Sequence, residues 1–472
     1  MARPLTIYHS PLRTAESHVL TAGFHKICIS PPVGAALAGF AARGGISEGI
    51  HDDLFVRALA LESESSALAL VSVDVLALPG EFVRRVRRAV QDRTGLRPEA
   101  VMIASTHTHA GPVTITTFFN PDQSVEAQYM DRLAEAIAAC VAAAWRERFP
   151  ARVGVGCGRV QGLGINRRSP SQQPVDEEIG IIKVEDTEGR TRAVLINYAC
   201  HPTVLGPNNL LVTGDFPAFA LEHIEKALGP DGFAMFVNGT QGNISMGHSS
   251  ELSAIGVITP GRTFERAAEI GRRLAEATFS ALPEIETEAL PVLAAASVSL
   301  DLPLKKYLPV EETARALREA EDHLAQLTGA EAAMEQLMEA MTKHLYASIN
   351  HFYAGEARAF AVGRLPVELQ GLRTGNSAFM AVPAEVFVEI GLRLKRLAPV
   401  RTFIVGLANG YIGYLPTREA YPAGGYEVVA AKVAPGSEDL LIEAAIELEK
   451  RMLGTLAIIE RNEARNCRGN KR

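Results

Sequence analysis

The sequence predicts an α/β protein with mixed twisted β-sheets flanked by helices and an inserted helical hairpin. Apolar, β-prone runs alternate with segments of helical periodicity along most of the 472 residues. The run 66–75 is almost wholly apolar, which is typical of a strand in a sheet that is covered on both faces. Residues 309–358 differ, because leucines and methionines recur there at helical spacing among charged residues. These residues are expected to form the hairpin.

The individual elements follow from periodicity and from the residues that interrupt it. Pro31 and Pro32 end the first strand, and Pro399 closes a helix that the stretch 382–385 opens. Strands are expected over 20–29, 54–62, 66–75, a run that begins at 101, 153–157, 180–185, 192–199, 233–238, 292–302 and 401–407. Helices are expected over 81–94, 127–147, 216–228, 264–280 and 437–453, and a further helix is expected to end at 397.

The predicted domain organisation is a single domain formed by residues 20–305 and 360–460. A flexible arm of residues 1–19 precedes it, a tail of residues 461–472 follows it, and the hairpin of residues 306–359 is inserted into it. The hairpin is expected to pack against the body or to join two copies of the chain as a homo-oligomer.

Composition excludes several functional classes. A net charge of −7 and a single tryptophan argue against nucleic acid as a partner. The five cysteines are scattered and odd in number, which is typical of buried or free thiols in a reducing compartment. Neither a signal peptide nor a transmembrane segment is evident, so a cytoplasmic location is expected.

The most informative stretch runs from Val101 to Pro112. Its apolar strand ends in a turn that carries His107 and His109, and Gly111-Pro112 prevents a helix from continuing. On an extended backbone, side chains two apart point to the same face, so the two imidazoles are expected side by side. They could bind a divalent metal, or one could bind it while the other transfers protons. The alternative is a pair of hydrogen-bonded histidines at a strand end.

Other strands end in a similar way. The apolar strand expected over 192–199 leads to His201, and Pro202 directly after it prevents the strand from continuing. Asp74 is expected to be a buried hydrogen-bonding anchor or to orient a metal-binding histidine, and Asp215 is expected to be a helix N-cap. Glycines in the loop 37–45 are expected to let the backbone approach another group closely. Ser245 follows a strand but lacks the Gly-x-Ser-x-Gly spacing of a nucleophile elbow.

Taken in order, these motifs resemble the catalytic region of the neutral/alkaline non-lysosomal ceramidase family, without the family's C-terminal β domain. The ordered set consists of His107-Thr108-His109-Ala110-Gly111-Pro112, Asn166-Arg167, His201-Pro202-Thr203, Gly242-Asn243-Ile244-Ser245, Pro383-Ala384-Glu385 and Tyr411-Ile412-Gly413-Tyr414. Members of this family are zinc-dependent hydrolases of N-acyl amide bonds.

The resemblance implies one catalytic Zn²⁺ ion held by His107, His201, Glu385 and Tyr414. It implies that His109 is the acid/base group and that Arg167 and Tyr426 contact the scissile group. Ser245 matches a serine of the family, either as a catalytic or substrate-binding residue or as a residue that shapes a turn. Asn166, Gly242 and Asn243 are expected to bind substrate.

The expected reaction is hydrolysis of a ceramide-like or other N-acyl amide by attack of a zinc-bound water. One alternative keeps zinc but cleaves an ester or a small cyclic amide. The other is a non-catalytic scaffold that retains the fold and binds a partner through the hairpin.

Overall fold

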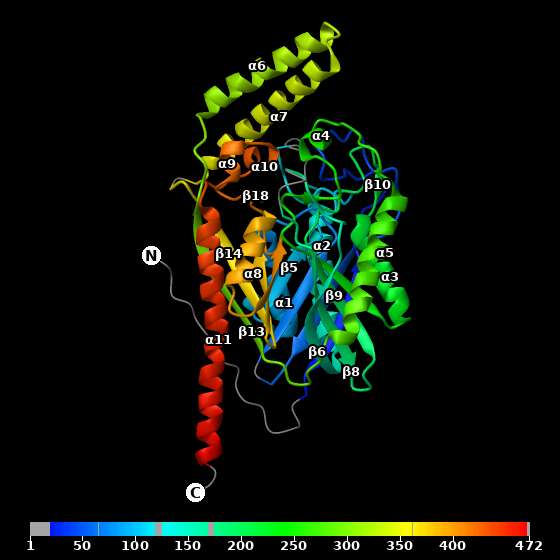
Figure 1. Cartoon of the computed structure of the whole chain (residues 1–472), viewed down its shortest axis with the longest axis vertical. Helices are drawn as coiled ribbons and strands as arrows, with labels where there is room; N and C mark the ends of the chain where they lie inside the picture. Colours follow the sequence, from blue (N-terminus) through cyan, green and yellow to red (C-terminus); the bar gives the residue numbers. More distant parts are fainter. Residues whose placement is uncertain (1–18, 65, 119–124, 169–173, 361, 470–472) are drawn as a thin grey trace.

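The computed structural model describes residues 19–64, 66–118, 125–168, 174–360 and 362–469 (Figure 1). The predicted flexible arm therefore lies, apart from residue 19, outside the described residues. Two β-sheets pack face to face between layers of helices, which confirms the predicted α/β class with mixed sheets flanked by helices.

The larger sheet has eight strands in the order β11-β9-β8-β6-β1-β3-β4-β5. Strands β3 and β4 are buried almost from end to end, because both faces of the sheet are covered there. The bounds are β1 (Thr21–Cys28), β3 (Phe55–Glu62), β4 (Ala67–Val73), β5 (Val101–Ser105), β6 (Phe149–Arg159), β8 (Glu178–Asp186), β9 (Thr191–Tyr198) and β11 (Phe233–Asn238).

The smaller sheet has four strands: β13 (Leu293–Pro303), β14 (Arg364–Thr374), β15 (Ser377–Val382) and β17 (Arg401–Gly406). Leucines and methionines of the larger sheet, such as Leu70 and Met102, share one core with Phe379 and Phe403 of the smaller sheet. The two phenylalanine rings stack with centroids 5.2 Å apart. Burial of this apolar surface is the main force that holds the sheets together.

Helices cover the outer face of each sheet. The larger sheet is covered by α1 (Gly80–Thr94) and α2 (Ala127–Arg146) at one end and by α3 (Asp215–Leu228) and α5 (Phe264–Ala281) at the other. The smaller sheet is covered by α8 (Val388–Leu397) and α11 (Ser437–Gly469). No helix among the described residues is both long and apolar enough to span a lipid bilayer.

Short elements complete the chain. They are β2 (Gly49–Ile50), β7 (Ile165–Asn166), β10 (Leu211–Val212), β12 (Ile244–Ser245), β16 (Glu385–Val386), β18 (Tyr414–Leu415), α4 (Ser250–Ala254), α9 (Ala420–Ala423), α10 (Tyr426–Val429) and the 3₁₀ turns Pro98–Ala100 and Leu282–Glu284.

Within the two main sheets, three pairs of neighbouring strands run parallel: β4 with β5, β9 with β11, and β15 with β17. Their carboxyl ends meet at one end of the sandwich, where the chain leaves the strands through loops (Figure 1). Loops at the carboxyl ends of parallel strands are a frequent place for binding sites in α/β proteins. The histidine-bearing segments all lie at this end.

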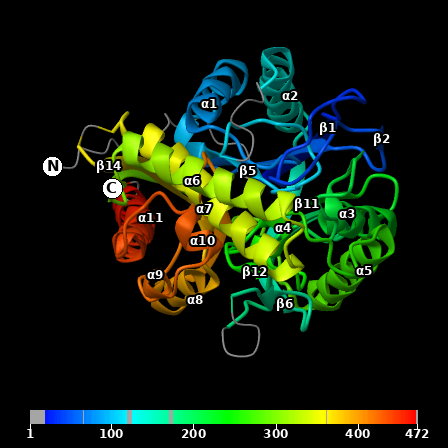
Figure 2. The same cartoon turned by 90° about the horizontal axis from the view of Figure 1, so that it is seen from above.

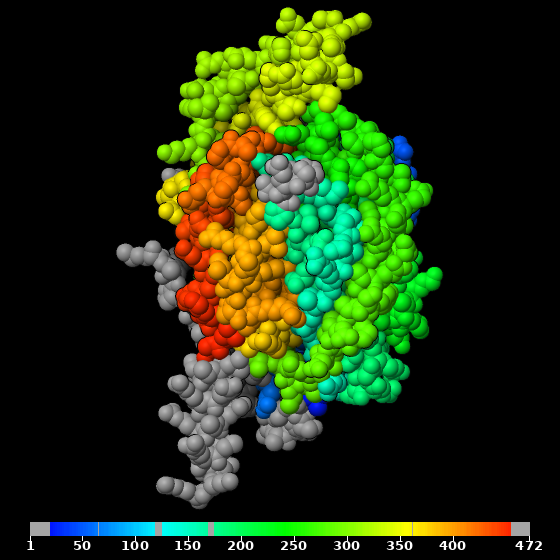
Figure 3. Space-filling model, viewed as in Figure 1, coloured from blue at the N-terminus to red at the C-terminus, as the bar shows by residue number. Residues whose placement is uncertain are grey.

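The hairpin forms an arm, defined here as α6 (Val310–Gly329) and α7 (Met334–Ala357). It projects from the body in the space-filling view and crosses above the ends of the strands when seen from above (Figures 2 and 3). The carboxyl-terminal half of α7 reaches the body, where the Tyr346 hydroxyl hydrogen-bonds the Glu251 carboxylate of α4.

Two helix boundaries differ from the sequence expectation. The helix predicted to open at 382–385 begins only at Val388, because the N–H groups of Glu385 and Phe387 donate to the carbonyls of Gly413 and Leu415. Glu385 therefore lies in a short parallel bridge and not in a helix. The final helix runs on to Gly469 through part of the predicted tail, in a segment without proline and rich in helix-forming residues.

Replacing Glu449 by glutamine is expected to stabilise the protein at alkaline pH. Burial raises the pKa of this carboxyl to about 7, and only Thr402 hydrogen-bonds it among the described residues. The protonated carboxyl is the form that the folded protein favours. Its contribution to stability is therefore fully present below the unfolded pKa of 4.5, and it is lost as the pH rises through the folded pKa of about 7. The variant should be more stable by about 2 kcal/mol near pH 8, with almost no difference near pH 4.

Urea unfolding at the two pH values measures this effect. Glu443→Gln, on the exposed side of the same helix, is the control. An equal effect of Glu449→Gln at both pH values would contradict the assignment.

Candidate metal centre and its surroundings

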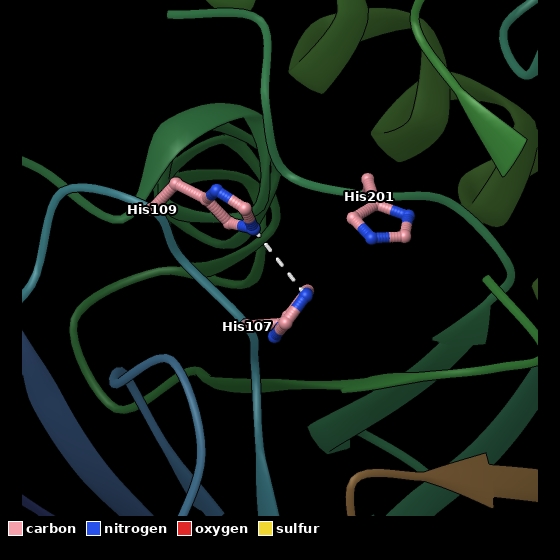
Figure 4. A group of neighbouring side chains, drawn as sticks. All are labelled: His107, His109 and His201. Atoms are coloured by element: carbon pink, nitrogen blue, oxygen red, sulfur yellow. Dashed lines mark hydrogen bonds between the residues drawn. The ribbon is translucent and has the colours of Figure 1, made fainter. Parts of the chain in front are cut away.

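His107 owes its position to an unusual backbone conformation. Strand β5 ends at Ser105, and His107 has a φ of 72°, in the left-handed region that non-glycine residues rarely adopt. Its N–H donates to the carbonyl of Val75 at 3.1 Å, which holds the turn. The expectation of an extended backbone here was wrong. The turn nevertheless brings the Nε2 atoms of His107 and His109 to 3.3 Å from each other (Figure 4).

His201 approaches from the loop after β9. Its Nδ1 atom lies 2.7 Å from the carbonyl oxygen of Gln241, and Nδ1 of His107 lies 2.8 Å from that of Leu76. A carbonyl oxygen can only accept a hydrogen bond, so both Nδ1 atoms carry the proton. In the neutral imidazoles the Nε2 atoms then present bare lone pairs.

Glu385 completes the cluster. Its Oε2 atom lies 2.9 Å from Nε2 of His201 and 3.4 Å from Nε2 of His107. The side chains of His107, His201 and Glu385 are buried, whereas His109 is partly exposed. One ring nitrogen from each of the three histidines lies within 4.8 Å of the others. Figure 4 shows the three rings gathered around a common space.

The charges in the cluster depend on one another. Burial lowers the pKa of His201 to about 4, and burial also lowers the pKa of His109 well below its usual value. Burial alone would raise the pKa of Glu385, but the adjoining His107 and His201 hold it well below its usual range. At neutral pH the Glu385 carboxylate therefore lies beside the neutral imidazoles of His109 and His201.

This donor set fits a divalent metal such as zinc. Two bare Nε2 lone pairs and a carboxylate oxygen repel one another at 2.9 and 3.4 Å unless a cation lies between them. Ligands ~2.1 Å from zinc in a tetrahedral arrangement lie about 3.4 Å apart, close to these separations. The carbonyls of Leu76 and Gln241 fix the tautomers that ligation requires.

Tyr414 lies opposite Glu385 in the bridge between β16 and β18, so the two side chains share one face. Its hydroxyl accepts a hydrogen bond from Nη2 of Arg167 at 3.1 Å, and the same Nη2 atom donates to the carbonyl of Gly242 at 2.9 Å. The ring of Tyr426 packs edge-on against Tyr414, with centroids 5.9 Å apart. The structure thus brings the predicted ligand and the two predicted amide-contacting residues together beside the cluster.

The residues expected to bind substrate take part in scaffolding contacts. The amide groups of Asn166 and Asn243 both donate to the Glu389 carboxylate, and Asn243 also accepts the N–H of Val388. These bonds attach two loops to the start of α8. The Ser245 hydroxyl donates to the carbonyl of His248 and accepts its N–H. This geometry favours the alternative in which Ser245 shapes a turn.

Two glycines allow a close approach beside the cluster, and the sequence led us to expect it for the loop that contains Gly39. A Cβ atom on Gly39, which has a φ of 105°, would lie 2.5 Å from the ring of His109. A Cβ atom on Gly242 would lie 2.5 Å from the carbonyl oxygen of Glu385. Both contacts are possible only for glycine. Gly242 therefore has a structural role beside the carboxylate, in addition to its predicted place in substrate binding.

Two buried aspartates accept backbone N–H groups, and one of them fixes a loop that carries a histidine. Asp74 accepts the N–H of Phe55 at 2.9 Å, in agreement with the expected buried anchor. Asp215 does not cap α3 in the predicted way. Its carboxylate accepts the N–H groups of Val204, Leu205 and Phe216 and so fixes the loop that follows His201.

Sequence reasoning missed the role of Tyr411. Its hydroxyl donates to Oε1 of Glu385 at 2.7 Å, the oxygen that faces away from the histidines. The sequence motif Tyr411-Ile412-Gly413-Tyr414 contains both tyrosines, but the family resemblance implies a role only for Tyr414. Spacing alone does not tell which of two tyrosines three residues apart reaches a carboxylate.

Replacing Tyr411 by phenylalanine is expected to weaken metal binding by about 10- to 100-fold, because Glu385 loses the hydrogen bond that orients it. Competition with a chelator of known affinity measures the change. Tyr421→Phe is the matched control, since its hydroxyl donates to the carbonyl of Val433 and not to the cluster. Equal metal affinity in both variants would show that Tyr411 does not orient the ligand.

Residues 23–250 match the family model described as neutral/alkaline non-lysosomal ceramidase, N-terminal. The chain is 24% identical to the neutral ceramidase of Drosophila melanogaster, over 90% of this chain and 73% of that protein. It is 26% identical to the neutral ceramidase of Mycobacterium tuberculosis, over 80% of this chain and 68% of that protein.

The crystal structure of neutral ceramidase from Pseudomonas aeruginosa superposes with a TM-score of 0.70. The match covers 93% of this chain and 75% of that chain, at 19% identity. At this identity the likeness shows a shared fold. Together with the family model and the curated relatives, it confirms the family resemblance predicted from the ordered motifs.

Proposed function

Because the chain belongs to the neutral/alkaline non-lysosomal ceramidase family, we propose that it hydrolyses an N-acyl amide bond, ceramide-like or simpler, with one zinc ion as cofactor. The observation that carries this proposal is the convergence of His107, His201 and Glu385, with both Nδ1 protons committed to carbonyl oxygens. Catalytic zinc sites keep a position for water beside their protein ligands and can expand to five ligands, so a fourth protein ligand is compatible with catalysis. Tyr414 is the proposed fourth protein ligand.

Zinc, when bound, supplies Lewis-acid activation of water and of the amide carbonyl at neutral pH. The protein positions the amide. Nη1 of Arg167 makes no hydrogen bond to any described residue, so it is the donor left for the carbonyl oxygen of the substrate. The hydroxyl of Tyr426, from the adjoining ring, is the second proposed donor. Such donors stabilise the negative charge that develops on this oxygen.

His109 is proposed to transfer the proton. It is neutral at physiological pH because burial lowers its pKa, and a neutral imidazole can accept a proton from the attacking water. As the C–N bond breaks, the same proton passes to the departing nitrogen. The products are a carboxylic acid and an amine.

A panel of N-acyl amides of increasing acyl length, assayed with and without a chelator, tests this proposal. We expect hydrolysis that the chelator abolishes and zinc restores, with preference for long apolar acyl groups. Cleavage of esters or cyclic amides alone would favour the second type of zinc hydrolase. Chelator-resistant hydrolysis would overturn the zinc mechanism, and no turnover of any substrate would favour the scaffold.

A further inference from the structure

We infer that Glu427 is the positioning residue that orients Arg167 toward the substrate. This inference rests on the proposed function, because it concerns the same amide-binding group. No motif in the sequence singled out Glu427, which directly follows Tyr426 in α10.

Glu427 is buried, with only 2% of the residue exposed. Its carboxylate connects α10 to the segment that carries Arg167 and to α4. Its Oε1 atom accepts from Nε of Arg167 at 2.8 Å and from the Ser250 hydroxyl of α4 at 2.8 Å. Its Oε2 atom accepts from Nη1 of Arg168 at 3.0 Å. Each oxygen is thus held by charged or hydroxyl donors, which leaves the carboxylate little freedom to rotate.

The guanidinium of Arg167 is fixed at two edges as a result. Nε is held by Glu427, while Nη2 is held by the carbonyl of Gly242 and the hydroxyl of Tyr414. These bonds define the plane of the group and the direction of Nη1. Without Glu427 the guanidinium could pivot about Nη2, and Nη1 would no longer point in one direction.

The charge balance supports the same role. One carboxylate is shared between two guanidinium groups, so the trio keeps a net charge of +1. The site thus remains attractive to an oxygen that becomes negative during the reaction. A carboxylate paired with Arg167 alone would cancel the charge on which that attraction depends.

A double-mutant cycle tests the inference, with Glu427→Gln, Arg167→Lys and the two combined. We expect Glu427→Gln to lower kcat by ~10- to 100-fold, because small displacements of a positioning group have effects of this size. Bound zinc should stay at the wild-type amount. Since Glu427 acts through Arg167, the double variant should be no slower than Arg167→Lys alone. Glu419→Gln, the same change at an exposed site nearby, is the control.

The inference would be overturned if the kcat reductions of the two single variants multiply in the double variant. It would also be overturned if Glu427→Gln keeps the wild-type kcat. If Glu427→Gln does not fold, Glu427→Asp keeps the charge on a shorter side chain and should give an intermediate kcat. A crystal structure of the variant adds a readout that is independent of turnover. An Arg167 side chain in its wild-type place would refute the positioning role even if the proposed substrate class is wrong, whereas a displaced guanidinium would support it.

Discussion

Replacing His201 by alanine is expected to remove the bound metal and to reduce amide hydrolysis by at least ~10³-fold, since a direct ligand matters more than the groups that orient it. The ring is fully buried, and its Nε2 atom lies nearest to the Glu385 carboxylate. Without it, the site keeps only one imidazole ligand, His107, beside Glu385 and the proposed ligand Tyr414, and zinc binding weakens. Metal analysis of the purified protein and the hydrolysis rate at saturating zinc measure the two effects.

His248→Ala is the matched control for this variant. His248 is also a buried histidine with a lowered pKa, but its Nδ1 atom contacts Thr259 and not the cluster. Both variants should lose ~1–3 kcal/mol of stability from the polar groups left without partners. Only His201→Ala should lose the metal. Equal zinc content in the two variants would remove His201 from the ligand set.

The arrangement of strands and helices could be predicted because it depends on local patterns. The apolar run that became β4 is buried on both faces, and the spacing that became α1 places Phe82, Val83 and Val86 on the covered side. Periodicity and breaking residues encode such features within a few turns of chain. Likewise, His107 and His201 both follow apolar strands, so their presence at one end of the sheets followed from the strand pattern.

Details that depend on contacts between distant residues could not be predicted from local patterns. The left-handed backbone of His107 is held by a bond to Val75, and the bridge that keeps Glu385 out of a helix is formed with residues 413–415. The link between Tyr411 and Glu385 likewise joins segments 26 positions apart. Neither hydrophobic periodicity nor residue type reports such pairings.

Several sequence-based expectations stay predictions. A catalytic or substrate-binding role for Ser245, a cytoplasmic location and self-association through the arm are among them. The arm can be tested through its exposed Met334 and its half-buried Leu324. If two copies join there, charged residues at these positions should change the mass in solution without changing bound zinc.

Replacing Arg167 by methionine is expected to lower kcat by ~10²–10³-fold, the usual effect of removing one donor to a developing oxyanion. Methionine fills a similar volume but offers no donor. Burial alone would lower the pKa of Arg167, but the neighbouring Tyr414 and Glu427 raise it above its usual value, so the group stays charged. The binding of unreactive substrate analogues should change much less than kcat, because the contact strengthens in the transition state.

Arg168→Met separates this role from a general loss of charge. Arg168 donates to the same Glu427 carboxylate and to the carbonyl of Gly424, whereas Arg167 hydrogen-bonds Tyr414 and Gly242. Arg168→Met should therefore reduce kcat by less than about one tenth of the factor by which Arg167→Met reduces it. Only the indirect contribution through Glu427 disappears in this variant. Equal losses in the two variants would mean that both arginines serve only to hold Glu427. The substrate oxygen would then have to be bound by another donor, with Tyr426 the first to replace by phenylalanine.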